Sequence, residues 1–169
     1  MNEETTETGS WKPHFDVLSK WPSNKYSGLQ IEIDPQGDLL LVNFLKGFES
    51  AWKGWQGPDD EKIKLASEFV KNSIPYDEEY FEYQIEKKKK QYLGRMIVEG
   101  GVCTVYALAM HTALAQVGRE TTILRDAAHT WVRDDLSGRE MDPTNGDDFL
   151  VNRQIKGTLN LSKFVRPRL

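Results

Sequence analysis

Cysteine occurs once in this chain of 169 residues, at Cys103, and that count limits how the chain can be stabilised. An intramolecular disulfide is excluded, and so is a zinc or iron–sulfur site built from several cysteines. The fold must therefore depend on a hydrophobic core, and a chain of this length has room for one as a single ordinary domain. A lone cysteine is either a small buried apolar residue or a reactive thiol, and its neighbourhood has to decide which.

The composition is typical of a soluble globular protein, with 38% hydrophobic and 28% charged residues. A net charge of −4 argues against general binding to nucleic acid, and no segment approaches the roughly 20 apolar residues of a membrane span. The polar N-terminus does not resemble a secretory signal peptide, so a cytoplasmic location is the default and export by another route stays open. We expect a disordered tail at 1–10, an aromatic-rich extension at 11–57 and a core at 58–169, the last two forming one compact domain.

The first half of the chain predicts strands followed by helices. Residues 29–34 alternate apolar and polar side chains as a strand does, and 39–42 is expected to return as a second strand after a turn. A short helix is predicted for 43–55, where four aromatic residues share one face that is typical of core packing. Helices are also predicted for 59–73, with Asp59 or Asp60 as the N-cap, and for 77–93.

The lysine run at 87–90 lies near the end of the last of these helices, where positive charge complements the helix dipole. We therefore interpret it as a solvated helix face, and a patch for nucleic acid or anionic lipid is the alternative.

The second half predicts one more helix and an antiparallel sheet. The helix runs from Cys103 to Val117 and ends at Gly118. His111 lies on this helix about 12 Å from Cys103, too far to act in the same site, and is expected to be partly exposed or hydrogen-bonded. Three strands are predicted at 121–124, 129–133 and 140–144, with edge strands in 149–169.

The position of Cys103 favours the reactive thiol. Only the thiolate attacks, and a helix N-terminus and a nearby imidazolium both lower the pKa of a thiol. Cys103 follows Gly100-Gly101-Val102 and opens its helix, so unpaired backbone N–H groups should point toward the sulfur. The two glycines let the backbone and a substrate approach closely.

His129 can return to this helix start. The helix carries the chain roughly 21 Å away from the sulfur, and six or seven extended residues bring it back by about 20 Å. Small residues, Ala127 and Ala128, precede His129 and leave room for a substrate. The alternative is a strand histidine bonded to a backbone carbonyl.

Asp142 is the candidate third member. If 135–138 forms a four-residue hairpin loop, Trp131 pairs with Asp142, and His129 shares their face of the sheet because side chains alternate. A two-residue turn keeps the same face but moves Asp142 further from His129. The alternative for Asp142 is an ordinary turn aspartate before Pro143. Trp131 is expected to pack beside the site, with a substrate-binding role as the second reading.

Three motifs carry a family resemblance: Gly101-Val102-Cys103, then Ala128 to Val132 (AHTWV), then Met141 to Thr144 (MDPT). Together with the lead-in at 66–77 they resemble the core of the transglutaminase-like superfamily over about half of the chain. The resemblance implies a papain-like α+β fold, with the nucleophile at the N-terminus of a helix packed on an antiparallel sheet. It also implies Cys103 as nucleophile, His129 as general base and then acid, and Asp142 as the residue that orients His129.

Some family features are not matched. The interval between Cys103 and His129 is short, no acidic loop suggests a calcium site, and Ile97 stands where a papain-type enzyme offers a glutamine to the oxyanion. The backbone N–H of Cys103 is one expected oxyanion donor, and the second is unidentified.

The expected reaction is acyl transfer on an amide of a protein or peptide through a thioester, with no cofactor and no metal. Glutamine deamidation and transamidation are the leading outcomes, and the size suits a small bacterial enzyme or effector that modifies another protein. A cysteine peptidase and a catalytically silent binding module are the rivals. The oligomeric state is left open.

Overall fold

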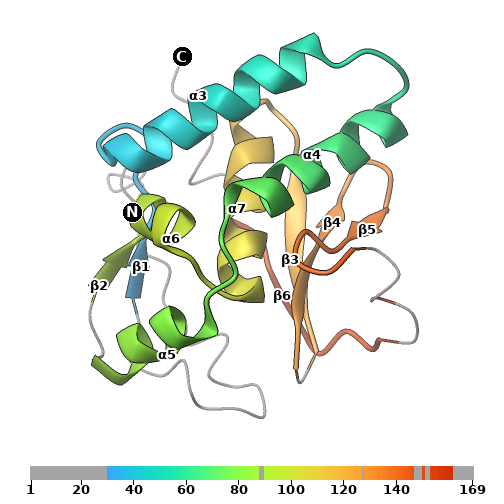
Figure 1. Cartoon of the computed structure of the whole chain (residues 1–169). Coiled ribbons are helices and arrows are strands. Elements are labelled where there is room, and N and C mark those ends of the chain that lie inside the picture. The colour runs from blue at the N-terminus through green and yellow to red at the C-terminus, as the bar shows by residue number, and fades with distance from the viewer. Residues whose placement is uncertain (1–29, 88–89, 127, 147–149, 151–152, 162–169) are drawn as a thin grey trace, which may run out of the picture.

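The computed structural model describes residues 30–87, 90–126, 128–146, 150 and 153–161. The predicted tail and the first part of the aromatic-rich extension lie outside these residues. Within the described part the fold is mixed α+β, and α7 lies between an antiparallel sheet and the other core helices (Figure 1). The predicted α+β class with an antiparallel sheet is therefore confirmed.

The sheet has four strands in the order β5-β4-β3-β6, and every neighbouring pair is antiparallel. The strands are β3 (Thr121–Arg125), β4 (Thr130–Asp134), β5 (Glu140–Met141) and β6 (Gly157–Leu159). The four-residue hairpin loop is confirmed, because the N–H of Asp134 donates to the carbonyl of Arg139 at 2.8 Å. β5 is shorter than predicted: a turn follows it, closed by a 2.9 Å bond from the N–H of Gly146 to the carbonyl of Asp142.

Helix α7 (Cys103–Gln116) is the centre of the core. Twelve consecutive residues, from Thr104 to Ala115, are buried, because the helix packs against the sheet on one side and against α3, α4 and α6 on the others. A helix that is apolar all round is one that neighbours enclose. It ends at Gly118, whose φ of 82° lies in the left-handed region that glycine favours, as the sequence predicted.

Helix α3 (Leu39–Gly54) replaces the second strand that we expected at 39–42. The carboxylate of Asp38 accepts the N–H of Leu41 at 3.3 Å and thereby caps the helix. The same carboxylate accepts the N–H of Gly94 at 2.9 Å, so the start of α3 is joined to a segment far along the chain. The periodicity of a short apolar run does not distinguish a helix from a strand. Here the Asp38 cap favours the helix. The strand prediction for 39–42 was wrong.

The predicted aromatic stripe of α3 lies in the core. Phe48 is fully buried and packs edge-on to Phe69 of α4 (Asp59–Ser73), with ring centroids 5.4 Å apart. The predicted range of α4 is confirmed. Its N-cap is Pro58, however, so Asp59 and Asp60 occupy the first turn, where their charge suits the helix dipole.

The single helix predicted for 77–93 was wrong. The chain forms α5 (Glu78–Lys87), then β2 (Lys90–Tyr92), then α6 (Leu93–Glu99). β2 pairs in parallel with β1 (Gln30–Glu32), and this contact between distant segments overrides the local helical pattern.

Only part of the predicted lysine face falls on described residues. Lys87 is at the end of α5, above the ring of Tyr83, and Lys90 pairs with Glu32 at 3.4 Å. Lys88 and Lys89 lie outside the described residues.

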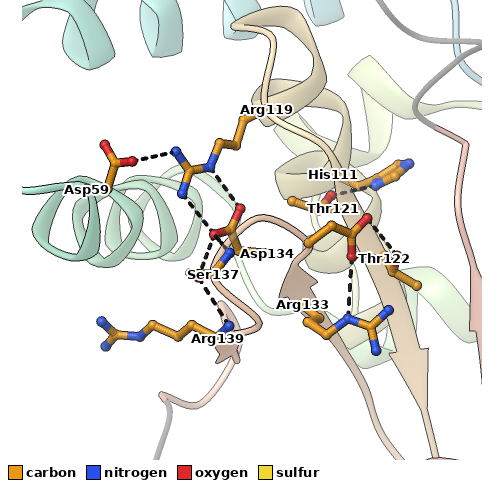
Figure 2. A network of polar contacts seen from close by, with 10 residues as sticks. Asp59, His111, Arg119, Thr121, Thr122, Arg133, Asp134, Ser137 and Arg139 are labelled. Carbon is orange, nitrogen blue, oxygen red and sulfur yellow. Dashed lines mark hydrogen bonds and ion pairs between the residues drawn. The ribbon is translucent and has the colours of Figure 1, made fainter.

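A buried ion pair joins the end of α7 to the β4–β5 hairpin (Figure 2). Arg119 donates to both carboxylate oxygens of Asp134, at 2.8 and 2.9 Å, and the side chain of Asp134 is fully buried. Arg119 also reaches Asp59 at the start of α4, and Ser137 donates to Asp134 from within the hairpin loop. One arginine therefore joins a helix, the hairpin and the C-terminal end of α7.

His111 is completely buried, and it is hydrogen-bonded as the second of our two expectations had it. Its Nε2 accepts the N–H of Leu161 at 2.9 Å, so Nδ1 carries the proton and donates to Thr121 Oγ1 at 2.7 Å. Burial lowers the pKa of His111 to about 4.

Acid should therefore destabilise the fold through His111. In the unfolded chain, His111 takes up a proton as the pH falls below its ordinary pKa of 6.5. In the folded chain it does so only near its lowered pKa of about 4. The contribution of neutral, buried His111 to the free energy of unfolding is fully present above pH 6.5, and it falls by about 3 kcal/mol as the pH drops to 4. Urea unfolding at both pH values measures it. His111→Gln, which does not titrate, should be less stable at pH 7 but lose correspondingly less on acidification. Equal losses in the two proteins would contradict the assignment.

Candidate active site

The loop before Cys103 is held by backbone pairing with an upstream segment. The N–H of Gly101 donates to the carbonyl of Pro75 at 3.1 Å, and the N–H of Asp77 donates to the carbonyl of Gly101 at 3.0 Å. A Cβ on Gly101 would lie 2.4 Å from Cγ2 of Val105, so only glycine fits there. Gly100 has a φ of 122°, which also requires glycine. These contacts by themselves require glycine at both positions, and the close approach of a substrate stays a prediction.

Cys103 is the first residue of α7, with Val102 as the N-cap. The residue as a whole is partly buried, and its thiol forms no disulfide. The first N–H groups of a helix lack partners within it, and they place positive potential at the sulfur. The start of α7 thus favours the thiolate, as the sequence predicted.

His129 and Asp142 meet across the β4–β5 pair. His129 Nε2 lies 2.6 Å from Asp142 Oδ2, and both side chains are buried. The observed register pairs Val132 with Met141, which places Trp131 opposite Asp142 as expected. The other carboxylate oxygen, Oδ1, accepts the N–H groups of Thr144 at 2.9 Å and Asn145 at 3.2 Å. Both oxygens are therefore occupied, and the carboxylate is held in one orientation.

The imidazole of His129 also lies close enough to the thiol of Cys103 for each group to shift the pKa of the other. Because Nε2 is bound to Asp142, Nδ1 is the ring nitrogen left for the sulfur. Burial on its own lowers the pKa of His129, but the bonds to Asp142 and Cys103 outweigh it and raise this pKa to about 9. Burial likewise raises the pKa of the thiol, and the hydrogen bond and charge of His129 outweigh it and lower this pKa. The two shifts act in the same direction, toward a thiolate–imidazolium pair.

Thr130 is a further neighbour of the sulfur that the sequence reasoning missed. Its N–H and hydroxyl lie close enough to lower the pKa of Cys103. The hydroxyl is buried and has no hydrogen-bond partner among the described residues. Side-chain alternation would place Thr130 on the opposite face from His129, so the sequence pattern gave no signal for it.

Trp131 lies behind the histidine. Its ring is stacked on that of His129, with centroids 6.1 Å apart and an interplanar angle of 14°, and its Nε1 donates to Glu140 Oε1 at 2.9 Å. It has no exposed surface. Complete burial favours the packing role of Trp131. A role in substrate binding stays a prediction.

Ile97, at the position where a papain-type enzyme has glutamine, is buried in the core on α6. The backbone N–H of Cys103, at the free start of α7, stays the expected donor.

The pH dependence of alkylation tests this electrostatic arrangement. We expect iodoacetamide to modify Cys103 rapidly well below about pH 8, near which a free cysteine begins to react. A second change is expected near pH 9, where the imidazolium of His129 loses its proton. The two steps belong to the coupled pair. His129→Ala should move the reaction to higher pH, and a single titration at the free-cysteine value in the unaltered protein would contradict the arrangement.

The described residues hold no group of three or more histidine, cysteine, aspartate and glutamate side chains placed to bind a metal ion. In the same part of the chain, none of the helices has the length and apolar character needed to cross a membrane. Comparison with protein-family models, curated proteins and solved structures found no match.

Proposed function

We propose that this protein is a transglutaminase-like cysteine enzyme with a papain-like fold, which transfers the acyl group of an amide through a thioester. The observation that carries the proposal is the placement of Cys103 at the start of a helix beside His129, whose imidazole is hydrogen-bonded to Asp142. A nucleophile, a base bonded to it and a group that orients the base are the parts that nucleophilic catalysis needs.

In the first half-reaction, the thiolate of Cys103 attacks the carbonyl carbon of a carboxamide, most simply that of a glutamine side chain. The negative charge moves to the carbonyl oxygen, where the N–H of Cys103 stabilises it. The intermediate collapses as the C–N bond breaks, and His129 donates its proton to the leaving nitrogen. Ammonia departs, and a thioester remains on Cys103.

In the second half-reaction, the neutral His129 takes a proton from an acyl acceptor, which attacks the thioester and releases the thiolate. Water as acceptor gives deamidation, and an amine gives transamidation. Asp142 orients His129 and stabilises the imidazolium, because its two oxygens are held by His129 and by backbone N–H groups.

The experiment uses a blocked glutaminyl-glycine dipeptide and a panel of glutamine-containing proteins, with and without hydroxylamine as acceptor amine. Ammonia release with the mass gain of glutamine-to-glutamate conversion would support deamidation, and hydroxamate formation would support transamidation. New α-amino groups without ammonia would indicate a peptidase instead. Cys103→Ala is the matched control, since it removes only the sulfur. A reactive thiol that produces none of these products over the panel would favour the silent binding module and contradict the proposal.

A further inference from the structure

The turn that leads into His129 is closed by one side chain, that of Asp126. Its Oδ1 accepts the N–H groups of Ala128 and of His129, each at 2.8 Å. Its own N–H donates to the carbonyl of His129 at 3.1 Å. Both backbone groups of His129 are therefore bonded to the same residue, and this fixes the point from which the imidazole extends.

Asp126 is in turn held by the C-terminal part of the chain. Arg153 donates to Asp126 Oδ2 at 2.5 Å, and both side chains are largely buried, with exposed fractions of 20% and 13%. Beside this contact the N–H of Lys156 donates to the carbonyl of Arg125 at 2.7 Å, and β6 continues along the edge of β3. The two oxygens of Asp126 thus have different partners: one oxygen closes the turn, and the other is anchored by Arg153.

We propose that Asp126, anchored by Arg153, is the positioning residue of the site, and that through it the C-terminal segment sets how readily Cys103 ionises. The inference rests on the proposed function only in assigning His129 to Cys103. It adds a role for two residues that touch neither the sulfur nor a substrate.

The physical reason is the narrow tolerance of the imidazole. One ring nitrogen must face Cys103 while the other stays 2.6 Å from Asp142 Oδ2, so the ring can shift little without losing one of the two bonds. A displacement of about 1 Å in such an arrangement costs up to about a hundredfold in rate. Trp131 stacks against one face of the imidazole ring. Asp126 fixes the backbone from which the ring extends.

Three variants separate positioning from charge. Asp126→Ala removes the acceptor of both N–H groups, Asp126→Asn keeps an oxygen for them but loses the ion pair, and Arg153→Gln removes only the anchor. The rate of Cys103 alkylation by iodoacetamide is measured from pH 5 to 10 for each. We expect Asp126→Ala to react about tenfold more slowly at pH 6.5, with its profile moved to higher pH. Asp126→Asn and Arg153→Gln both lose the ion pair while an oxygen acceptor for the two N–H groups remains, so each should react about threefold more slowly.

Arg133→Gln is the matched control. Arg133 pairs with Asp135 at 3.4 Å near the far end of β4, the strand that follows His129. Its profile should superimpose on that of the unaltered protein. Thermal unfolding shows whether each variant is folded at the assay temperature, and if Asp126→Ala is not, the shift in Arg153→Gln decides. Unshifted profiles in Asp126→Ala and Arg153→Gln would overturn the proposal, and so would Asp126→Asn behaving like Asp126→Ala, which would show an effect of charge.

The readout is ionisation of the thiol and needs no substrate. Absence of amide turnover would therefore count against the proposed function while leaving this inference to be decided by the profiles. If the thiol of the unaltered protein has an ordinary pKa, the proposed function loses its basis. The inference then depends on the NMR titration of His129 in Cys103→Ser, where Asp126→Ala should lower the imidazole pKa and an unchanged value would overturn it.

Discussion

Asp142→Asn is expected to abolish the rapid alkylation of Cys103 below pH 7 and, under the proposed function, to lower kcat by about 10⁴-fold. The amide has one oxygen where the carboxylate has two. Its oxygen best faces the N–H groups of Thr144 and Asn145, which leaves its NH₂ group toward His129 Nε2. Nε2 must then be an acceptor, so the imidazolium is disfavoured and the thiolate loses its counter-ion.

Alkylation and turnover of this variant are compared with those of Asp142→Ala and Asp60→Asn. Asp142→Ala should lose about as much as Asp142→Asn, because neither holds the imidazolium. Asp60→Asn changes an exposed aspartate on α4 in the same way and should leave both measurements unaltered. An Asp142→Asn protein with the activity of the unaltered one would show that this carboxylate does not stabilise His129.

Asp134→Ala is expected to have the largest effect on stability, lowering the free energy of unfolding by about 3–5 kcal/mol. The carboxylate is fully buried, and its loss leaves Arg119, whose side chain is only 12% exposed, without its bidentate partner. Ser137 loses the acceptor of its N–H and hydroxyl as well, so the hairpin loop between β4 and β5 is released (Figure 2). Urea unfolding at pH 7 measures the change.

Asp59→Ala is the control for that experiment, because it removes the other carboxylate bound to the same arginine. Asp59 is 64% exposed, and its loss should cost less than about 1 kcal/mol. Similar losses in the two variants would mean that burial of the Arg119–Asp134 pair is not what makes it important. Because β5 leads directly into Asp142, loosening the hairpin in Asp134→Ala should also reduce thiol reactivity.

The hairpin shows what a sequence of this kind reveals on its own. Turn residues at 135–138 left a four-residue loop and a two-residue turn open, and both placed Asp142 on the face of His129; the structure has the four-residue loop, which brings the two closer. Each step depends on neighbours in the chain, and for that reason it could be made without a structure. The start of α7 at Cys103 and its end at Gly118 follow equally local rules.

The errors lie where distant segments meet. The apolar run at 39–42 becomes helical under a cap that also binds Gly94, and a Cβ on Gly94 would lie 2.4 Å from the N atom of Leu41. The helical charge pattern of 77–93 is interrupted because 90–92 pairs with β1. Neither contact leaves a periodic signal in the sequence.

The site residues divide in the same way. Cys103, His129 and Asp142 were found from spacing and parity, and the structure brings their side chains together. An aspartate three residues before His129 is a recognisable turn signal, so Asp126 was within reach of sequence reasoning. Its partner Arg153 comes from a segment without a strong pattern, and only the folded chain reveals it.

The pairing of Gly101 with Pro75 and Asp77 limits how a substrate can be recognised. An extended polypeptide laid beside Gly101 would find both the donor and the acceptor of that residue already engaged, so it could not be bound there as an added strand. Under the proposed function, recognition at this point would then depend on the group inserted toward the sulfur. A glutamine side chain, which projects its amide away from its own backbone, satisfies that condition more readily than an internal peptide bond does.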